Sequence, residues 1–219
     1  MSDFNVAIFS DKDFTRKQLI TTDDPWGMNG EKCNGGSTLS SFLFDNQIRE
    51  FTEKAGSFRG YNGPCVALGV HFDFDGASAQ EDVKNFLTRM YDDKASVSPE
   101  TDCRVWFSGS KGFHVLMGLG RGRIGPSDRT PTLVKQIAEK VAARYITWDS
   151  SVYDRTRGIR VNNSRHQKSG LFKIELHPNE LWTHSLDEIK QIAFFPRMLN
   201  NEETKIKIAQ ANKRFANAR

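Results

Sequence analysis

Between residues 66 and 75, apolar residues alternate with other residues at a period of two. This period predicts a β-strand, because successive side chains of a strand point to opposite faces. The apolar face consists of Val66, Leu68, Val70, Phe72 and Phe74. The opposite face carries Ala67, Gly69, His71, Asp73 and Asp75. Two carboxylates therefore point to the same side of one predicted strand.

Two longer segments have the 3.6-residue period of amphipathic helices. In residues 78–91, Ser78 and Glu81 form a capping-box pattern. The apolar stripe of this helix is Val83, Phe86, Leu87 and Met90. In residues 130–146 the stripe is Leu133, Ile137, Val141 and Tyr145. Between these helices, residues 103–118 predict two short strands joined by a glycine-rich turn.

The remaining segments have weaker patterns. Residues 22–37 are rich in Gly, Asn and Asp and predict a loop. A partial stripe predicts a helix that Ser37 or Ser40 caps, with apolar positions at Phe42, Leu43, Ile48 and Phe51. Residues 171–176 predict a short strand, and a final helical region begins near Leu186.

Composition sets wider limits on the class of protein. A chain of 219 residues is long enough to bury a core in one domain, or in two lobes that share one. Its net charge of +4 is compatible with an anionic partner. We find no apolar run near the roughly 18 residues of a membrane helix and no secretory signal, so we expect a cytoplasmic protein. The three distant cysteines predict isolated thiols at Cys33, Cys65 and Cys103.

The paired aspartates of the predicted strand are the first candidate site. Residues two apart in a strand are separated by about 6.6 Å, so the Asp73 and Asp75 carboxylates can approach a shared cation. Without a cation the two charges repel, and Mg²⁺ or Mn²⁺ would remove the repulsion through the oxygen ligands that they prefer. The alternative is a strand end with two solvated aspartates before a turn at Gly76.

Two further segments could bind phosphate groups. The sequence SGSKGFHVLM (108–117) has a glycine-rich turn with Lys111 and His114, although a hairpin with a basic tip is the plainer interpretation. Residues 148–170 are dense in basic side chains, namely Arg155, Arg157, Arg160, Arg165, His166 and Lys168. Arginine binds phosphate oxygens bidentately, but a solvated basic loop or a patch for the nucleic-acid backbone is also compatible with this segment.

Three segments, in this order, resemble the signatures of the archaeo-eukaryotic primase (AEP) superfamily, and in particular its primase-polymerase (PrimPol) branch. FDFDG (72–76) is similar to the Asp-x-Asp metal motif, and SGSKGFH (108–114) is similar to the Ser-x-His motif as small primase subunits carry it. The third match consists of Asp149, Val152, Tyr153, Arg157, Arg160, Ser164, His166, Lys168 and Gly170. We refer to these segments as motifs 1, 2 and 3.

The resemblance implies a role for each matching residue. Asp73, Asp75 and Asp149 would be the catalytic ligands of two Mg²⁺ or Mn²⁺ ions. The nucleotide-binding residues would be Ser110, Lys111, His114, Arg157, Arg160, His166 and Lys168. Three features depart from the family pattern: Gly112 replaces the serine of Ser-x-His, VNNS (161–164) replaces a proline-containing turn, and Asp154 is close enough to Asp149 to be an alternative third ligand. His71, which shares the face of the two aspartates, either orients a ligand or packs beneath the site.

The resemblance also implies a fold and an organisation. We expect an α/β (α+β) fold with mixed or antiparallel sheets, one of them of the RNA-recognition type, and an active site between two lobes. Residues 1–60 would form a segment of the N-terminal lobe, residues 61–185 the catalytic core, and residues 186–219 a C-terminal helical extension. The chain would be one catalytic domain, either complete or the N-terminal part of a longer replication protein.

The implied activity is template-dependent nucleotidyl transfer, in which a DNA primase or polymerase makes primers, extends them, or does both. Its partners would be a single-stranded DNA template, deoxy- or ribonucleoside triphosphates, and a helicase in the same or another chain, in a bacterial, archaeal, viral or plasmid replication context. Two alternatives remain. A metal-dependent nuclease would need the same acids and basic residues, and a non-catalytic DNA-binding module would need only the basic ones.

Overall fold

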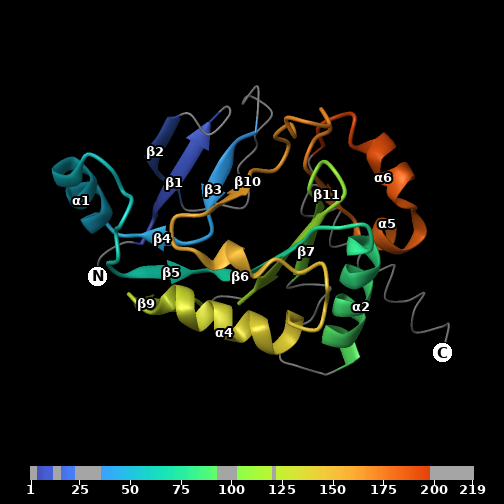
Figure 1. The fold of residues 1–219 in the computed structure, drawn as a ribbon, viewed down its shortest axis with the longest axis horizontal. Helices are drawn as coiled ribbons and strands as arrows, with labels where there is room; N and C mark the ends of the chain where they lie inside the picture. The colour runs from blue at the N-terminus through green and yellow to red at the C-terminus, as the bar shows by residue number, and fades with distance from the viewer. Residues whose placement is uncertain (1–3, 12–15, 23–35, 93–102, 120–121, 198–219) are drawn as a thin grey trace.

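The computed structural model describes residues 4–11, 16–22, 36–92, 103–119 and 122–197. Cys33, most of the expected loop 22–37 and residues 198–219 of the expected C-terminal extension lie outside this range. The chain has a mixed α/β fold built on two antiparallel sheets (Figure 1). No helix among the described residues is both long and apolar enough to cross a membrane.

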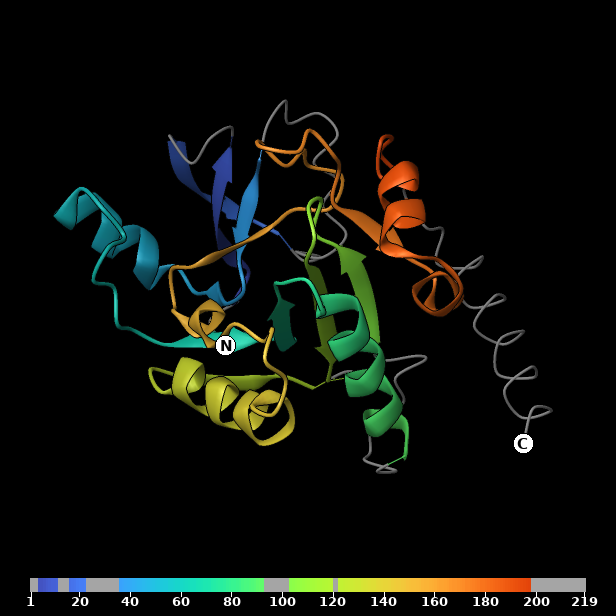
Figure 2. The ribbon, with the colours of Figure 1, turned by 45° about the vertical axis from the view of Figure 1, so that its right-hand side comes forward.

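The first sheet has seven strands, and its order is β10-β3-β1-β4-β5-β9, with β2 paired to β1. Its strands are β1 (Val6–Asp11), β2 (Arg16–Thr21), β3 (Thr38–Ser40), β4 (Leu43–Phe44), β5 (Cys65–Ala67), β9 (Ile124–Ser127) and β10 (Gly158–Arg160). The second sheet has the order β11-β7-β8-β6. Its strands are β6 (Gly69–Phe74), β7 (Cys103–Phe107), β8 (Phe113–Gly118) and β11 (Ile174–Leu176). Figure 2 shows the chain continuing from β10 in the first sheet toward β11 in the second.

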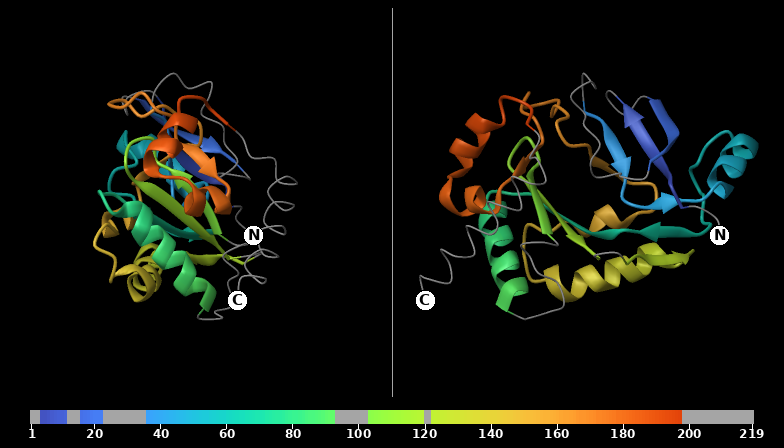
Figure 3. Two further views of the ribbon diagram at one scale, coloured as in Figure 1. Left: turned by 90° about the vertical axis from the view of Figure 1, so that its right-hand side faces the viewer. Right: turned by 180° about the vertical axis from the view of Figure 1, so that it is seen from behind.

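Helices cover one side of this framework. Helix α4 (Thr130–Ala142) packs against β5, β6 and β9, and Figures 1 and 3 show it lying along these strands from the front and from behind. Helix α2 (Ala79–Asp92) packs on β6 and β8. The remaining helices are α1 (Gln47–Ala55), the 3₁₀ turn η3 (Ser150–Tyr153), α5 (Pro178–Thr183) and α6 (Leu186–Ile192).

The predicted strand 66–75 is two strands, so the prediction of one continuous strand is wrong. β5 belongs to the first sheet and β6 to the second, and the change occurs at Leu68. Gly69 permits close packing at this point, because a Cβ there would lie 2.7 Å from the carbonyl oxygen of Met117. The alternation itself is confirmed within β6, where Val70, Phe72 and Phe74 are fully buried. One segment therefore connects the two sheets.

The apolar face of β6 forms the core together with α2. The predicted helix 78–91 is confirmed as α2, and its predicted stripe is buried. Phe86 contacts both Phe72 and Phe74, with ring centroids 4.7 and 5.6 Å away. Because this face packs on the helix, the other face of the same sheet, which carries His71 and Asp73, is left for the site.

Two helix predictions need correction. In α4 the buried residues are Thr130, Val134, Ala138 and Ala142, whereas the predicted stripe residues Leu133 and Ile137 are 42% and 36% exposed. The small side chains of Ala138 and Ala142 let the helix lie close to the strands. Leu133 and Ile137 lie next to this buried face rather than on it. The helix predicted after Ser37 or Ser40 begins only at Gln47, because residues 38–44 form β3 and β4. Ser40 instead accepts a hydrogen bond from the Ile8 N–H.

Candidate active site

The chain brings the acids of motifs 1 and 3 together by strand-like pairing. Residues 147–149 run antiparallel to the end of β6, with a bridge between Phe74 and Trp148. The N–H of Asp149 donates to the carbonyl of Asp73 at 2.8 Å, and the N–H of Asp75 donates to the carbonyl of Thr147 at 2.7 Å. Asp149, which is 74 positions or more from the other two in sequence, is therefore a backbone neighbour of Asp73.

Asp73 is the most buried of the three carboxylates. Its side chain is 28% exposed, compared with 39% for Asp149 and 61% for Asp75. Burial, together with the nearby charges of Asp149 and Asp75, raises the pKa of Asp73 from its ordinary 3.8 to about 6. The three acids thus repel one another, which is the situation that a bound cation would relieve.

The carboxylates are not gathered around one point. Among the described residues, no three His, Cys, Asp or Glu side chains are close enough together to hold a metal ion as they stand. The Asp149 carboxylate instead accepts hydrogen bonds from the N–H and Oγ of Ser151, both at 2.8 Å. A shared cation would therefore require the exposed Asp75 and Asp149 side chains to turn toward Asp73.

Each carboxylate has one basic neighbour from motif 2 or motif 3. Lys111 Nζ lies 3.9 Å from Asp75 Oδ1, and His114 Nε2 lies 3.7 Å from Asp73 Oδ1. Arg157 lies 3.6 Å from Asp149 Oδ2. These long separations are typical of weak, partly solvated pairs, so the basic groups are free to bind another anion.

His114 lies opposite Asp73 in the β6–β8 register, and Trp106 of β7 is the next residue in the same row. Burial holds the pKa of His114 well below its usual range, and the charges of Lys173 and Arg160 act in the same direction. Its imidazole is therefore neutral at neutral pH. The Nδ1 atom is buried and has no hydrogen-bond partner among the described residues.

A pocket of about 130 Å³ joins all three motifs. It is lined by Thr38, His71, Phe72, Asp73, His114, Val152, Arg157, Gly158, Ile159 and Arg160. The walls come from β6 and β8 on one side and from β3 and β10 on the other. A larger cavity of about 640 Å³ adjoins it and shares Thr38, Arg157 and Gly158. Thr38 was not predicted as a site residue, and its short strand carries no sequence pattern that would have indicated one.

His71 lines the pocket as well. It is 4% exposed, and burial holds its pKa well below the usual range, with a further contribution from Lys173. The backbone carbonyl of His71 accepts a hydrogen bond of 2.5 Å from the Tyr153 hydroxyl of motif 3. His71 is thus a neutral wall of the pocket and part of the link between motifs 1 and 3.

The glycine-rich turn of motif 2 is the predicted turn between two strands, β7 and β8. Gly112 approaches motif 1 closely, because a Cβ there would lie 2.7 Å from the Phe74 carbonyl oxygen and 3.3 Å from Asp75 Oδ1. This contact gives a physical reason for glycine where the family pattern has serine. Ser110 lies in the same turn but makes no hydrogen bond with any described residue.

His166 and Lys168 belong to a loop that contacts this turn. Ser169 Oγ donates to the carbonyl of Gly109, and His166 Nδ1 accepts from the Ser169 N–H at 3.3 Å. Burial lowers the pKa of His166, and the charges of Arg160 and Lys168 lower it too. Neither His166 nor Lys168 lines the pocket of motifs 1 to 3, so their predicted contact with a nucleotide stays a prediction.

Asp154 occupies a different position from Asp149. Its Oδ1 accepts hydrogen bonds from the N–H and Oγ1 of Thr156, both at 2.9 Å, and it lines the larger adjoining cavity. Its charge does not contribute to the raised pKa of Asp73, whereas that of Asp149 does. This geometry favours Asp149 over Asp154 as the third acid of the cluster.

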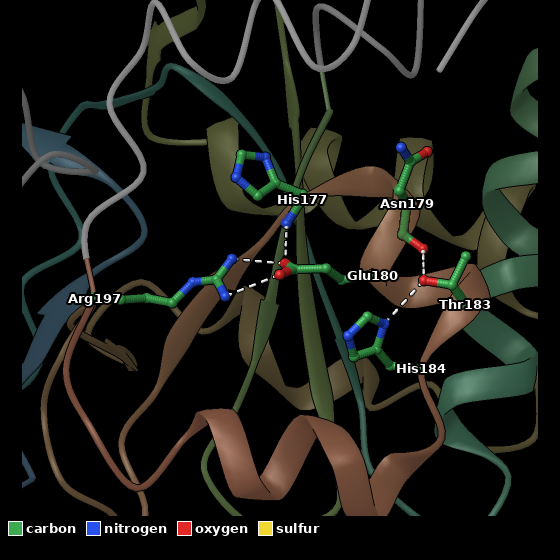
Figure 4. A network of polar contacts seen from close by, with 6 residues as sticks. All are labelled: His177, Asn179, Glu180, Thr183, His184 and Arg197. Carbon is green, nitrogen blue, oxygen red and sulfur yellow. Dashed lines mark hydrogen bonds and ion pairs between the residues drawn. The ribbon is translucent and has the colours of Figure 1, made fainter. Parts of the chain in front are cut away.

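A polar network fixes the chain after motif 3 (Figure 4). Arg197 forms a bidentate pair with Glu180, at 3.0 and 2.6 Å, and Glu180 also accepts from the His177 N–H. The N–H of Arg197 donates to Oδ1 of Asn163, which has a left-handed backbone with φ of 57°. Asn163 lies within the VNNS segment, so this network ties that segment to α5 through Arg197.

No protein-family model matches the chain, and no curated protein matches it. Among solved structures, the fold is similar to the polymerase domain of Mycobacterium tuberculosis Ligase D in complex with DNA. The TM-score is 0.44 and the sequence identity is 17%, with 80% of this chain and 60% of that chain covered. The chain thus spans about three fifths of the length of that structure.

Proposed function

We propose that the protein is a template-dependent nucleotidyltransferase that synthesises or extends DNA or RNA strands. The observation that carries this proposal is the single pocket lined by Asp73, His114, Arg157 and Arg160, one or two residues from each of the three motifs. Carboxylates beside arginines and a neutral histidine suit a nucleoside triphosphate with its metal ions.

The donor set fits divalent cations. Asp73, Asp75 and Asp149 offer carboxylate oxygens, which Mg²⁺ and Mn²⁺ prefer, and burial together with their mutual repulsion raises the pKa of Asp73. These three residues would hold the ions. When bound, such ions activate the attacking hydroxyl and stabilise the charge on the leaving pyrophosphate. The protein side chains then have the task of positioning the nucleotide.

The remaining side chains can position the nucleotide. The guanidinium groups of Arg157 and Arg160 are suited to phosphate oxygens, and Arg160 Nε is buried without a partner among the described residues. His114, when its proton is on Nδ1, donates to a phosphate oxygen or a sugar hydroxyl. The 3′-hydroxyl of the primer or first nucleotide attacks the α-phosphorus, a new P–O bond forms, and pyrophosphate leaves. Arg157, Arg160 and His114 would raise the rate by positioning the triphosphate and by stabilising its negative charge.

A metal-dependent nuclease is the second candidate, because it would use the same carboxylates to cleave DNA without any triphosphate. The unpaired guanidinium nitrogen Arg160 Nε and the neighbouring Arg157 favour a ligand with several phosphate oxygens inside the pocket, which a nucleoside triphosphate provides. A binding module would need no carboxylate cluster. The single-stranded template would approach the basic surface around motif 3, and a helicase partner stays an expectation from the family resemblance.

The test is nucleotide incorporation on a single-stranded template, with and without a primer, in Mg²⁺ or Mn²⁺. We compare the wild type with Asp73→Asn and Asp149→Asn, and use Asp187→Asn on α6 as a control because this exposed acid is paired only with Lys190. We expect products that require both triphosphate and metal and that are lost in the two site variants alone. Cleavage of DNA without triphosphate would support the nuclease, and metal-independent binding without products would support the binding module.

A further inference from the structure

Lys173 is a buried lysine beside the site that no motif includes. It is 4% exposed and directly precedes β11. Its Nζ donates to the carbonyl of Arg160 at 2.7 Å and lies 4.8 Å from the centre of the Trp106 ring. Backbone hydrogen bonds with Ser164 and Asn163 fix its place beside motif 3.

The charge of Lys173 has no carboxylate partner among the described residues. One candidate, Glu175, is held by Arg104 in a bidentate pair at 2.7 Å. Burial, together with the charge of Arg160, lowers the pKa of Lys173 to about 7. The charges of Asp73 and Glu175 act on this pKa in the opposite direction, but neither carboxylate forms an ion pair with Lys173 among the described residues. Because burying an ammonium without a carboxylate partner costs folding free energy, a stabilising ion pair does not explain the position of this lysine.

Lys173 and Arg160 line the same small cavity next to the main pocket. This cavity of about 20 Å³ is lined by Lys173, Trp106, Asn162, His71, Ile159 and Arg160, among others, and the last three also line the main pocket. The Arg160 guanidinium has few bonds of its own: Nε is unpaired among the described residues, and one terminal nitrogen makes a 3.4 Å bond to the Arg165 carbonyl. The direction of the Arg160 side chain therefore depends on the contacts that hold its backbone, among them the hydrogen bond from Lys173.

We propose that Lys173 is a positioning residue, which fixes the backbone of Arg160 so that its guanidinium meets a polyphosphate in the pocket. This inference rests on the proposed function for the identity of the ligand, a nucleoside triphosphate. Lys173 does not line the pocket of motifs 1 to 3, so its effect on the ligand passes through Arg160.

The experiment measures binding of inorganic tripolyphosphate by calorimetry without metal, at about pH 6, one unit below the pKa of Lys173. The variants are Lys173→Met, which keeps the length and apolar stem, Arg160→Met, and the double variant. Lys135→Met on the exposed side of α4 is the control. We expect Lys173→Met to weaken binding about tenfold, because loss of the hydrogen bond to the Arg160 carbonyl frees the Arg160 guanidinium from its place in the pocket. Melting temperature should be unchanged or higher, because an unpaired buried charge is removed.

The double variant separates positioning from a direct effect. If Lys173 acts through Arg160, then Lys173→Met has little further effect when Arg160 is already methionine. Additive losses, a lower melting temperature with unchanged binding, or a wild type that binds no tripolyphosphate would each overturn the proposal. A parallel incorporation assay distinguishes the two proposals: Lys173-dependent binding in a protein that incorporates no nucleotide would support the positioning role and refute the polymerase.

Discussion

Asp73 is the most buried member of the carboxylate cluster. Replacing it with asparagine should abolish catalysis and, at neutral pH, stabilise the fold. The amide has the shape of the protonated acid but cannot ionise. In the wild type, the folded state binds a proton more tightly than the unfolded state does, because the pKa of Asp73 is about 6 when folded and 3.8 ordinarily. The folded wild type therefore loses stability as the pH rises between these two values, and Asp73→Asn does not.

The size of the effect follows from the two pKa values. A rise from 3.8 to about 6 corresponds to about 3 kcal/mol, since one pKa unit is about 1.4 kcal/mol. The side chain is 28% exposed, so screening by water reduces the estimate to about 2–3 kcal/mol. For a chain of this length, that is about 5–10 °C in melting temperature. At neutral pH and without metal, Asp73→Asn should be more stable than the wild type. In the incorporation assay with metal, the same variant should have no activity.

The assay is thermal unfolding of both proteins in a chelator, from about pH 4 to about pH 7.5. We expect similar melting temperatures at the acidic end, where the folded wild type holds its proton, and a gap that opens by about pH 6. Adding Mn²⁺ at neutral pH should raise the melting temperature of the wild type and close the gap, because a cation that binds the folded state stabilises it. Equal stability of the two proteins in chelator at neutral pH would refute the claim that the ionised Asp73 carboxylate destabilises the folded protein.

Three further variants test other parts of the structure. Arg160→Lys should raise the KM for nucleotide about tenfold with little change in unfolding temperature, because lysine lacks the planar guanidinium that binds two phosphate oxygens. An unchanged KM would show that Arg160 does not contact the nucleotide. Phe86→Ala should lower the free energy of unfolding in urea by about 3–5 kcal/mol, since Phe86 is buried against Phe72 and Phe74. Asn163→Ala should be about 1 kcal/mol less stable than Asn163→Gly, because only glycine adopts the left-handed backbone freely. Equal stability of this last pair would contradict a strained backbone at this position.

The features that the sequence predicts best have a strong local pattern. The helix α2 and the strands β7 and β8 were predicted from periodicity and from the glycine turn between them. The alternation in β6 correctly places His71 and Asp73 opposite the core, because a one-residue error would expose Phe72 and Phe74. The proximity of Asp149 to Asp73 came only from the family resemblance, since the pairing of residues 147–149 with β6 is a tertiary contact without a local pattern.

Other features depend on the environment that distant segments create. Strands β1 to β4 were not predicted, and with them Thr38 was missed as part of the pocket wall. The buried face of α4 was misjudged because it consists largely of Val134 and alanines, which a search for large apolar residues passes over. Lys173 is a single charged residue in an ordinary strand pattern, and only the packing of Trp106 and Arg160 around it makes it a buried cation.

The two buried charges beside the pocket, Asp73 and Lys173, form no ion pair among the described residues. Burial raises the pKa of Asp73 and lowers that of Lys173, and the attraction between the two charges offsets only part of each shift. The acids of motifs 1 and 3 lie together near the end of β6, and the cations Arg160 and Lys173 lie together along β10 and before β11. A ligand of one sign would satisfy only one of these groups, whereas a nucleoside triphosphate with divalent cations carries charges of both signs. This division of charge is a physical reason to favour a nucleotide with its metal ions over a bare nucleic-acid backbone as the occupant of the pocket.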